Sequence, residues 1–585
     1  MSTTPRISTY DLCIQSLSAN ITSDEQQTQM LRCISNSVDE TKSGVNAFYL
    51  IYAASLVFFM QAGFAMVCAG SVRLKNLQNT MLKNLLDACG AALGFYTVGY
   101  AFAWGSSYPG KSGETNNEGL TFAGLSNFFL VGLEQKAFWL FQFSFAATSA
   151  TIVAGALAER SQMLAYLLYS TALTAFVYPI VLHSIWTSNG FLSSFAANPL
   201  LEIGVIDYAG SLVVHVTGGQ TALIAACVLG ARKGRFREID GIKIARDFPG
   251  HSIALKMLGV FILWFGWYGF NAGSVYNITV KSNAVLAQNA VVNTTLSAAA
   301  GCISALLAKA WLSEKHTGEA TFSLTDALWG CLSGLVSVTG GCAIINSWAS
   351  IVIGLLSGLI YLCGSNLLVK MRVDDAVDAI PIHLFCGVWG AFSVGLFAVP
   401  EYVQLLHPGV TAAGWFYQPN DGRLLACQVI GILFVIGWVT VLMLPFFGLL
   451  HYLGWLRADS LDEIVGLDIS YHGAQTLSGA QTLPLDELST NDQYLEAHQQ
   501  RRQEQREKNQ KRGTLRRRML LLDLSSSKSD HRKPAQDSWQ EQQQSWQEQQ
   551  QSWQEQQQSW QEQQQSWQEQ KRGDHDIIGI EEGAI

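Results

Sequence analysis

Two histidines stand inside otherwise apolar stretches of the chain, each eight residues after an aspartate: His215 follows Asp207, and His383 follows Asp375. An ionisable side chain within such a stretch is costly, so it usually faces the interior of a helix bundle and carries function. An imidazole accepts a hydrogen bond at one nitrogen, donates at the other, and can pass a proton. The first hypothesis is therefore that both histidines line one narrow conduit. The alternative is a structural hydrogen-bonding role for each.

The apolar segments around these histidines are long enough to cross a membrane. The chain has 585 residues, of which 49% are hydrophobic and 14% charged, whereas soluble proteins average about a quarter charged. A membrane-spanning helix needs about 20 mostly apolar residues. The sequence predicts eleven such helices, near residues 47–70, 85–105, 137–158, 163–186, 209–230, 253–275, 284–309, 324–346, 348–369, 379–399 and 424–452.

Lysine and arginine concentrate in alternate connections, and this asymmetry predicts the orientation. With the N-terminus outside, the inner connections include the basic run 232–246 as well as Arg73, Lys83 and Arg160. An odd number of helices then places the C-terminus in the cytoplasm. The outer connections hold only Lys111, Lys136, Lys281 and Arg423.

The first five predicted helices echo the next five. Gly63-Phe64 and Ala69–Val72 in the first helix match Gly269-Phe270 and Ala272–Val275 in the sixth, and the Asp/His spacing recurs in the fifth and tenth. Because five is odd, the second copy enters the bilayer in the opposite direction, which is the inverted-repeat plan of transporters. We therefore expect an all-α membrane protein of two inverted five-helix repeats plus a final helix.

Aromatic and small polar residues accompany the candidate conduit in the third and sixth helices. A ring face attracts a cation by about 0.5–2 kcal/mol, and a hydroxyl can accept a hydrogen bond, so these groups suit a small cation that donates hydrogen bonds. Packing between helices is the alternative, which we favour for Trp264. The residues concerned are Phe141, Gln142, Phe145, Trp264, Trp267, Tyr268, Phe270 and Ser274.

Several motifs, in order and at fitting spacing, resemble the ammonium transporter family, which includes the methylammonium permeases and the Rhesus proteins. They are Asp207 to His215, Gly266–Ser274, Ala154–Arg160, Asp374 to His383 and, past the last helix, Gly466–Gly473. The resemblance covers about residues 45–475 and extends to the order of the motifs along the chain.

The resemblance implies a homotrimer in the plasma membrane, each subunit having its own pore, and a transporter rather than an enzyme, without metal or cofactor. Ammonium would be recruited at an outer aromatic site and deprotonated, and would cross as ammonia, with or without a relayed proton. Methylammonium is a further candidate substrate, and no nucleic acid is expected as a partner. An ammonium-sensing receptor with the same fold is the alternative. The implied residues are the pore histidines His215 and His383, the aromatic gate Phe145 and Phe270, the outer ammonium-binding residues Trp186, Ser274 and Phe145, and the supporting Asp207.

The chain outside the apolar helices divides by composition. We expect an extracellular segment over 1–46, a transmembrane domain over 47–456, a cytoplasmic regulatory segment over 457–480 and a basic, Gln/Trp-rich tail over 481–585. The resemblance makes Ser470 a candidate phosphosite and a kinase a candidate partner, since phosphate adds charge at a subunit contact. The tail repeats Ser-Trp-Gln-Glu-Gln-Gln-Gln, a low-complexity pattern to which we assign no chemistry. A disulfide of Cys13 and Cys33, within or between subunits, is left open.

Overall fold

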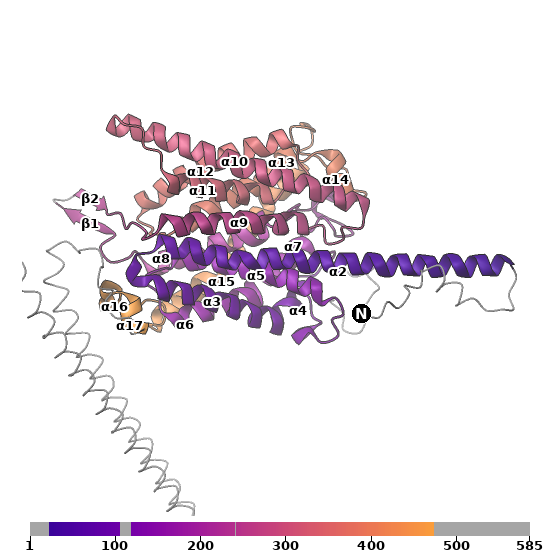
Figure 1. Ribbon diagram of the computed structural model, residues 1–585, viewed down its shortest axis with the longest axis horizontal. Coiled ribbons are helices and arrows are strands. Elements are labelled where there is room, and N and C mark those ends of the chain that lie inside the picture. Colours follow the sequence, from indigo (N-terminus) through magenta and orange to yellow (C-terminus); the bar gives the residue numbers. More distant parts are fainter. Residues whose placement is uncertain (1–22, 106–118, 240–241, 473–585) are drawn as a thin grey trace, which may run out of the picture. The chain divides into compact units, whose positions relative to one another are not determined.

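The apolar segments form helices close to where the sequence predicts them. This computed structural model describes residues 23–105, 119–239 and 242–472 (Figure 1). Among these residues, ten helical runs are long and apolar enough to span a membrane. The predicted eighth span is the shorter apolar helix α11 (Leu324–Thr339), of 16 residues. All described residues belong to one unit, Met1–His498; the second unit, Gln499–Ile585, which holds the heptad repeats, lies outside them.

The ten runs include several built from two to four consecutive segments. They are α2 (Ser23–Ser71); η1 (Leu74–Asn76), α3 (Leu77–Gly94), η2 (Phe95–Gly99) and α4 (Tyr100–Trp104); α5 (Lys136–Ala156); α6 (Met163–Ala172), η4 (Leu173–Val177) and α7 (Tyr178–Trp186); η6 (Ser211–Val216) and α8 (Thr217–Leu229); α9 (Ile253–Gly273); α10 (Lys281–Thr317); α12 (Ser347–Met371); η7 (Ile380–Phe385) and α13 (Cys386–Phe397); and α15 (Arg423–Tyr452). The shorter elements are η3 (Phe128–Leu130), η5 (Leu200–Glu202), β1 (Phe236–Ile239), β2 (Ile242–Ala245), α14 (Pro400–Leu406), α16 (Ser460–Val465) and α17 (Leu467–His472).

The first helix is much longer than predicted: α2 begins at Ser23 rather than near residue 47, and Figure 1 shows it running out past the neighbouring helices. No Gly or Pro interrupts residues 23–43, and Asp24 and Glu25 stand in the first turn, where negative charge favours a helix. Cys33 on this extension is disulfide-bonded. Cys13 lies outside the described residues.

The second helix also begins earlier than predicted, so Lys83, assigned to an inner connection, lies inside α3. Its ammonium group is buried and donates to the Ser161 carbonyl oxygen at 2.6 Å. The early start has a tertiary cause: the backbone N–H groups of Gln78 and Asn79 donate to the carboxylate of Asp468 in α17, at 2.9 and 2.8 Å. These first-turn donors would otherwise lack partners.

The connection between α11 and α12 is longer than the single residue that the predicted helices 324–346 and 348–369 leave between them. α11 ends at Thr339 and α12 begins at Ser347. Gly340 explains the early end, because its N–H donates to the Ser211 hydroxyl at 2.7 Å and its carbonyl accepts from Tyr208 N–H at 2.8 Å. The backbone of Gly340 therefore binds the segment at the start of η6 and does not continue the helix α11.

The secondary structure of the described residues is helical, as predicted, apart from one short β-hairpin in a connection. In the basic connection after α8, β1 and β2 form an antiparallel hairpin in which Phe236 lies opposite Ala245. Apolar and charged residues alternate along β2, which is the pattern of a strand. In the sequence this connection stands out only by its basic residues, and no strand is predicted there.

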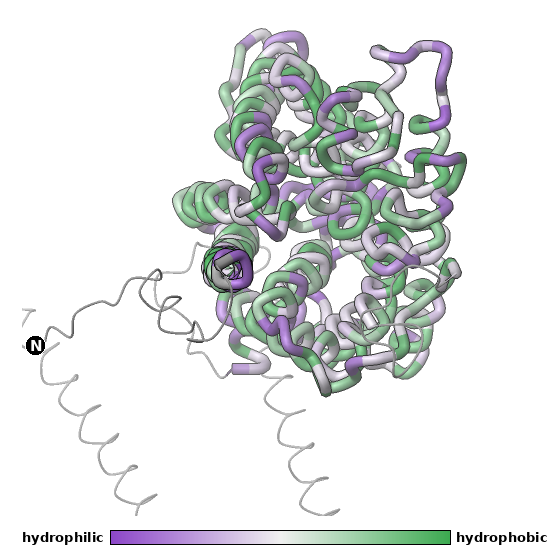
Figure 2. The backbone as a smooth tube through the Cα atoms, turned by 90° about the vertical axis from the view of Figure 1, so that its right-hand side faces the viewer, coloured by the Kyte–Doolittle hydropathy of each residue, from purple (hydrophilic) through white to green (hydrophobic). Residues whose placement is uncertain are grey.

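Small residues bring the long helices into backbone contact. α2 and α9 lie side by side in Figure 1, and a Cβ on Gly259 would lie 2.7 Å from the Gly63 carbonyl oxygen. Such small-residue contacts are typical of helix packing in membranes. Figure 2 views the helices nearly end-on, and most of their backbone carries hydrophobic residues. The buried polar groups described below are therefore exceptions.

Candidate functional site

The two histidines meet inside the bundle. His215 lies in η6 and His383 in η7, both π-helical segments, which are rare and frequent at functional sites. Their Nδ1 atoms are 3.2 Å apart and their ring centroids 5.2 Å apart, and the side chains are 0% and 4% exposed. Since one Nδ1 must donate and the other accept, the two neutral rings take opposite tautomers. The arrangement is a short chain of hydrogen-bonding groups in an apolar interior.

Glycines after each histidine allow this approach. A Cβ on Gly219 would lie 2.4 Å from the backbone nitrogen of Leu384, and one on Gly387 would lie 3.0 Å from the Ser211 carbonyl oxygen. The first distance excludes a side chain, and the second is tighter than most real Cβ contacts, so each histidine-bearing element packs through a glycine against the other. The pairing of the imidazoles depends on this backbone contact.

The aspartate eight residues before each histidine fixes the start of its π segment. Asp207 Oδ2 accepts from the N–H groups of Leu212 and Val213, both at 2.9 Å. Asp375 Oδ2 accepts from Ile380 N–H at 2.7 Å. The recurring Asp/His spacing thus has the same local geometry twice, and the carboxylates act as caps.

A continuous column of rings runs through the histidine pair. Phe145 and Phe270 are stacked with centroids 4.0 Å apart and planes at 19°. Trp186 lies 6.0 Å from Phe145 at one end, and Phe64 lies 6.1 Å from His383 at the other. Between them, His215 lies 5.7 Å from Phe270. The sequence-predicted gate and pore residues are therefore brought into one file.

A cavity lies at each end of this column. The wide cavity, of about 300 Å³, is lined by Trp186, Asp207 and Ser274 together with Trp104, Phe138, Ile185, Ser188, Ser194, Phe195, Val205, Ile206, Tyr208, Tyr276, Leu406 and His407. The narrow cavity, of about 20 Å³, is lined by Phe64 and His383 among others. The stacked phenylalanines close the file between the wide cavity and His215.

The predicted outer residues take up distinct positions at the wide cavity. Trp186 Nε1 donates to the Asp207 carbonyl oxygen at 2.6 Å, which holds the indole against the wall. The Ser274 hydroxyl donates to the Phe270 carbonyl at 2.9 Å and keeps its lone pairs available. Sequence reasoning missed several members of this wall, including Trp104, Tyr208 and His407, because only the fold brings them to it.

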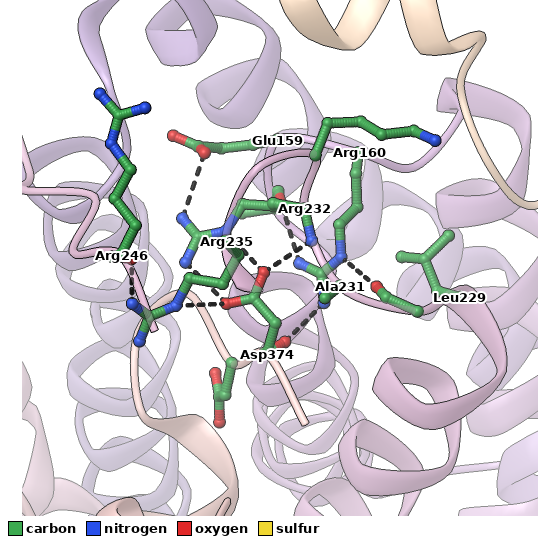
Figure 3. A network of polar contacts seen from close by, with 12 residues as sticks. Glu159, Arg160, Leu229, Ala231, Arg232, Arg235, Arg246 and Asp374 are labelled. Atoms are coloured by element: carbon green, nitrogen blue, oxygen red, sulfur yellow. Dashed lines mark hydrogen bonds and ion pairs between the residues drawn. The ribbon is translucent and has the colours of Figure 1, made fainter. Parts of the chain in front are cut away.

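Buried ion pairs join the ends of the helices that carry the histidines (Figure 3). Arg232, just after α8, pairs with Glu159 at 3.1 Å and with Asp374, just before η7, at 2.8 Å. Glu159 also binds Arg73 at 2.7 Å. Burial alone would raise the pKa of Glu159, but Arg232 and Arg73 lower it to about 2. Glu159 therefore stays charged, and the network links four inter-helix connections.

The segment after α15 is docked onto the same region. Glu463 accepts from Lys233 N–H at 2.5 Å and from Arg457 at 2.8 Å, while Arg457 donates to the carbonyl of Leu229 at the end of α8. Ser470 in α17 is 5% exposed, and its hydroxyl has no hydrogen-bond partner in the described part of the chain.

Comparison with known proteins identifies the fold and its setting. The sequence model of the Ammonium Transporter Family matches residues 47–477. The chain belongs to the ammonium transporter family. It is similar to Ammonium transporter 1 member 3 of Oryza sativa subsp. japonica, at 39% identity over 79% of this chain and 91% of the rice protein. Ammonium transporter 3 of Dictyostelium discoideum is 38% identical over 73% of this chain and 92% of its own length.

Solved structures share the architecture of this family member. A protein named Sensor Amt Protein aligns with a TM-score of 0.63 and 29% identity over 74% of this chain and 99% of its own. Candida albicans Mep2 aligns with a TM-score of 0.60 and 25% identity over 75% and 93%. Membership and the apolar helices together make this a multi-pass membrane protein whose relatives are ammonium transporters.

Proposed function

We propose that this chain moves ammonium across a membrane through a pore made by the ring column, with His215 and His383 as its hydrogen-bonding lining. The observation that carries the proposal is the 3.2 Å contact of their Nδ1 atoms in line with the stacked Phe145 and Phe270. A pore with these groups offers an uncharged amine hydrogen bonds where the rest of the wall is apolar.

Ammonium is recruited in the wide cavity by the faces of Trp186 and Phe145 and the hydroxyl of Ser274, with Asp207 supporting the wall. A bare cation does not pass the stacked rings, because its desolvation is too costly. Ammonium instead loses a proton and crosses as ammonia, the proton either staying outside or being relayed along the histidines. Potassium has no proton to lose and donates no hydrogen bonds, so it is rejected.

The topology belongs to the same proposal. We infer eleven membrane helices, α11 being the short one, in two inverted repeats of five plus α15, with the N-terminus outside and the C-terminus cytoplasmic. The matched aspartate caps before η6 and η7 support the repeat. We further infer a homotrimer in the plasma membrane, with methylammonium as a second substrate.

A measurement of uptake distinguishes transport from sensing. Sensing is the alternative function, because the chain is also similar to a protein named Sensor Amt Protein. In cells that lack their own ammonium transporters, expression of the wild-type chain should restore growth on low ammonium and uptake of labelled methylammonium. A chain that reaches the plasma membrane yet carries neither substrate would contradict transport and favour the sensor. Current recorded against external ammonium and pH would separate movement of NH3 from movement with a proton.

Ser470 is proposed as a regulatory phosphosite within this function. Its side chain is buried in α17, whose Asp468 holds the first turn of α3, so a phosphate or carboxylate there would displace α17 by desolvation and repulsion. Ser470→Asp should lower uptake several-fold without lowering surface amount. Ser470→Ala is the matched control and should transport like the wild type, since the hydroxyl has no partner among the described residues. Equal flux of both variants would contradict the switch.

A further inference from the structure

Several residues that line the wide cavity carry a buried polar atom that the proposed recruitment of ammonium does not use. In the described part of the chain, Trp104 Nε1, Asp207 Oδ1 and the Tyr208 hydroxyl are buried without a hydrogen-bond partner, and all three residues line this cavity. A buried polar group left unpaired costs about 1–3 kcal/mol. The cavity volume of about 300 Å³ leaves room for water and a small polar ligand beside them.

His407 belongs to this same wall. It follows α14 directly and is 4% exposed, and its ring lies 4.2 Å from that of Phe195. Its Nε2 is 3.2 Å from the Ser194 hydroxyl, and its Nδ1 makes no hydrogen bond among the described residues. Burial lowers the pKa of His407 to about 4, so the imidazole is neutral at physiological pH. A neutral imidazole has one donor and one acceptor nitrogen.

We propose that His407 is a further ammonium-contacting residue: its Nε2–H donates to Ser194, and its Nδ1 accepts a hydrogen bond from ammonium in the wide cavity. This inference rests on the proposed function and places a second acceptor in the same cavity as the Ser274 hydroxyl, ahead of the stacked phenylalanines. It also adds selectivity. Potassium prefers oxygen ligands, as hard cations do, and gains little from a ring nitrogen, whereas ammonium gains a charge-assisted hydrogen bond.

The test is the concentration dependence of uptake in three variants at matched surface amounts. His407→Phe keeps a ring against Phe195 but removes the acceptor, and should raise KM about five- to tenfold, with Vmax unchanged within about twofold. Potassium should then compete more strongly with ammonium. His407→Gln restores an acceptor and should recover most of the affinity. The control His451→Phe changes an exposed histidine at the end of α15 and should have no effect.

Wild-type KM and potassium competition in His407→Phe would overturn the inference, and so would a loss confined to Vmax. If that variant does not reach the membrane, Ser194→Ala takes its place. Without the serine partner the ring loses the hydrogen bond that orients its Nδ1, so KM should rise about two- to threefold, and an unchanged KM would refute the proposal. Absence of uptake by the wild-type chain would instead refute the proposed function itself.

Discussion

Replacing His215 and His383 together by alanine is expected to reduce ammonium uptake to background, a loss of about 100-fold or more. Each imidazole supplies a hydrogen bond behind the stacked phenylalanines, where the rest of the wall is apolar, and a polar group left unpaired in such an interior costs about 1–3 kcal/mol. Two such losses raise the barrier by about 2–6 kcal/mol, or about one and a half to four powers of ten. Uptake of labelled methylammonium over time, at measured surface amount, is the readout.

Single variants test whether the two histidines act as a pair, and control variants test whether other histidines matter. Each single alanine variant breaks the 3.2 Å contact between the Nδ1 atoms, so each should lose most of the flux if the pair works as a unit. His316→Ala and His451→Ala remove exposed histidines at helix ends and should leave uptake unchanged. A double variant that still carries ammonium selectively over potassium would remove the pore role of the imidazoles.

The sequence was sufficient to predict which two histidines meet, but not the local backbone structure that carries them. An aspartate eight residues before an intramembrane histidine, occurring twice, placed His215 and His383 at corresponding positions, and the structure joins them. The π-helical segments that carry them were not predicted, since a π segment differs from an α-helix by one extra residue in a turn, without a strong sequence signal. The glycine contacts at Gly219 and Gly387 could be suspected, but their partners could not.

The helix boundaries and the wall of the wide cavity could not be predicted from the sequence, because both depend on contacts between distant parts of the chain. The early start of α3 depends on Asp468, nearly four hundred residues later in the chain, and hydropathy carries no trace of such a cap. The wall of the wide cavity combines residues from distant elements, such as Trp104 and His407. Lys83, Arg160 and Arg232 were counted as charges of the inner connections, and the sequence did not predict that all three are buried.

Replacing Asp374 by alanine is expected to lower the free energy of unfolding by roughly 3–5 kcal/mol. The reason is that Asp374→Ala removes a partner of the buried Arg232 guanidinium. Asp374 accepts from Arg232 at both oxygens, at 2.8 and 2.9 Å, and is 2% exposed. Loss of these bonds should loosen the end of α8 from the start of η7. The fraction of purified protein that stays monodisperse after heating measures the change.

The matched control is a surface pair of the same chemistry. Asp421 binds Arg423 at 2.9 Å with side chains 27% and 42% exposed, and Asp421→Ala should cost less than about 1 kcal/mol because water screens it. Equal losses in Asp374→Ala and Asp421→Ala would show that the buried network does not determine stability.

Acid should dismantle the same network in a definite pH window. The pKa of Glu159 falls from an ordinary 4.5 to about 2 in the folded protein, so its stabilising contribution is complete above about pH 5 and is lost as the pH falls from 4.5 toward 2. Burial opposes this direction, but Arg232 and Arg73 outweigh it. The wild-type protein should therefore lose stability through this window, and Glu159→Gln should be less stable at neutral pH and show a shallower acid loss. If both proteins lost stability with pH in the same way, other carboxylates would cause the acid loss. The ion pairs of Glu159 would then not be what holds the histidine-bearing helices together as the pH falls.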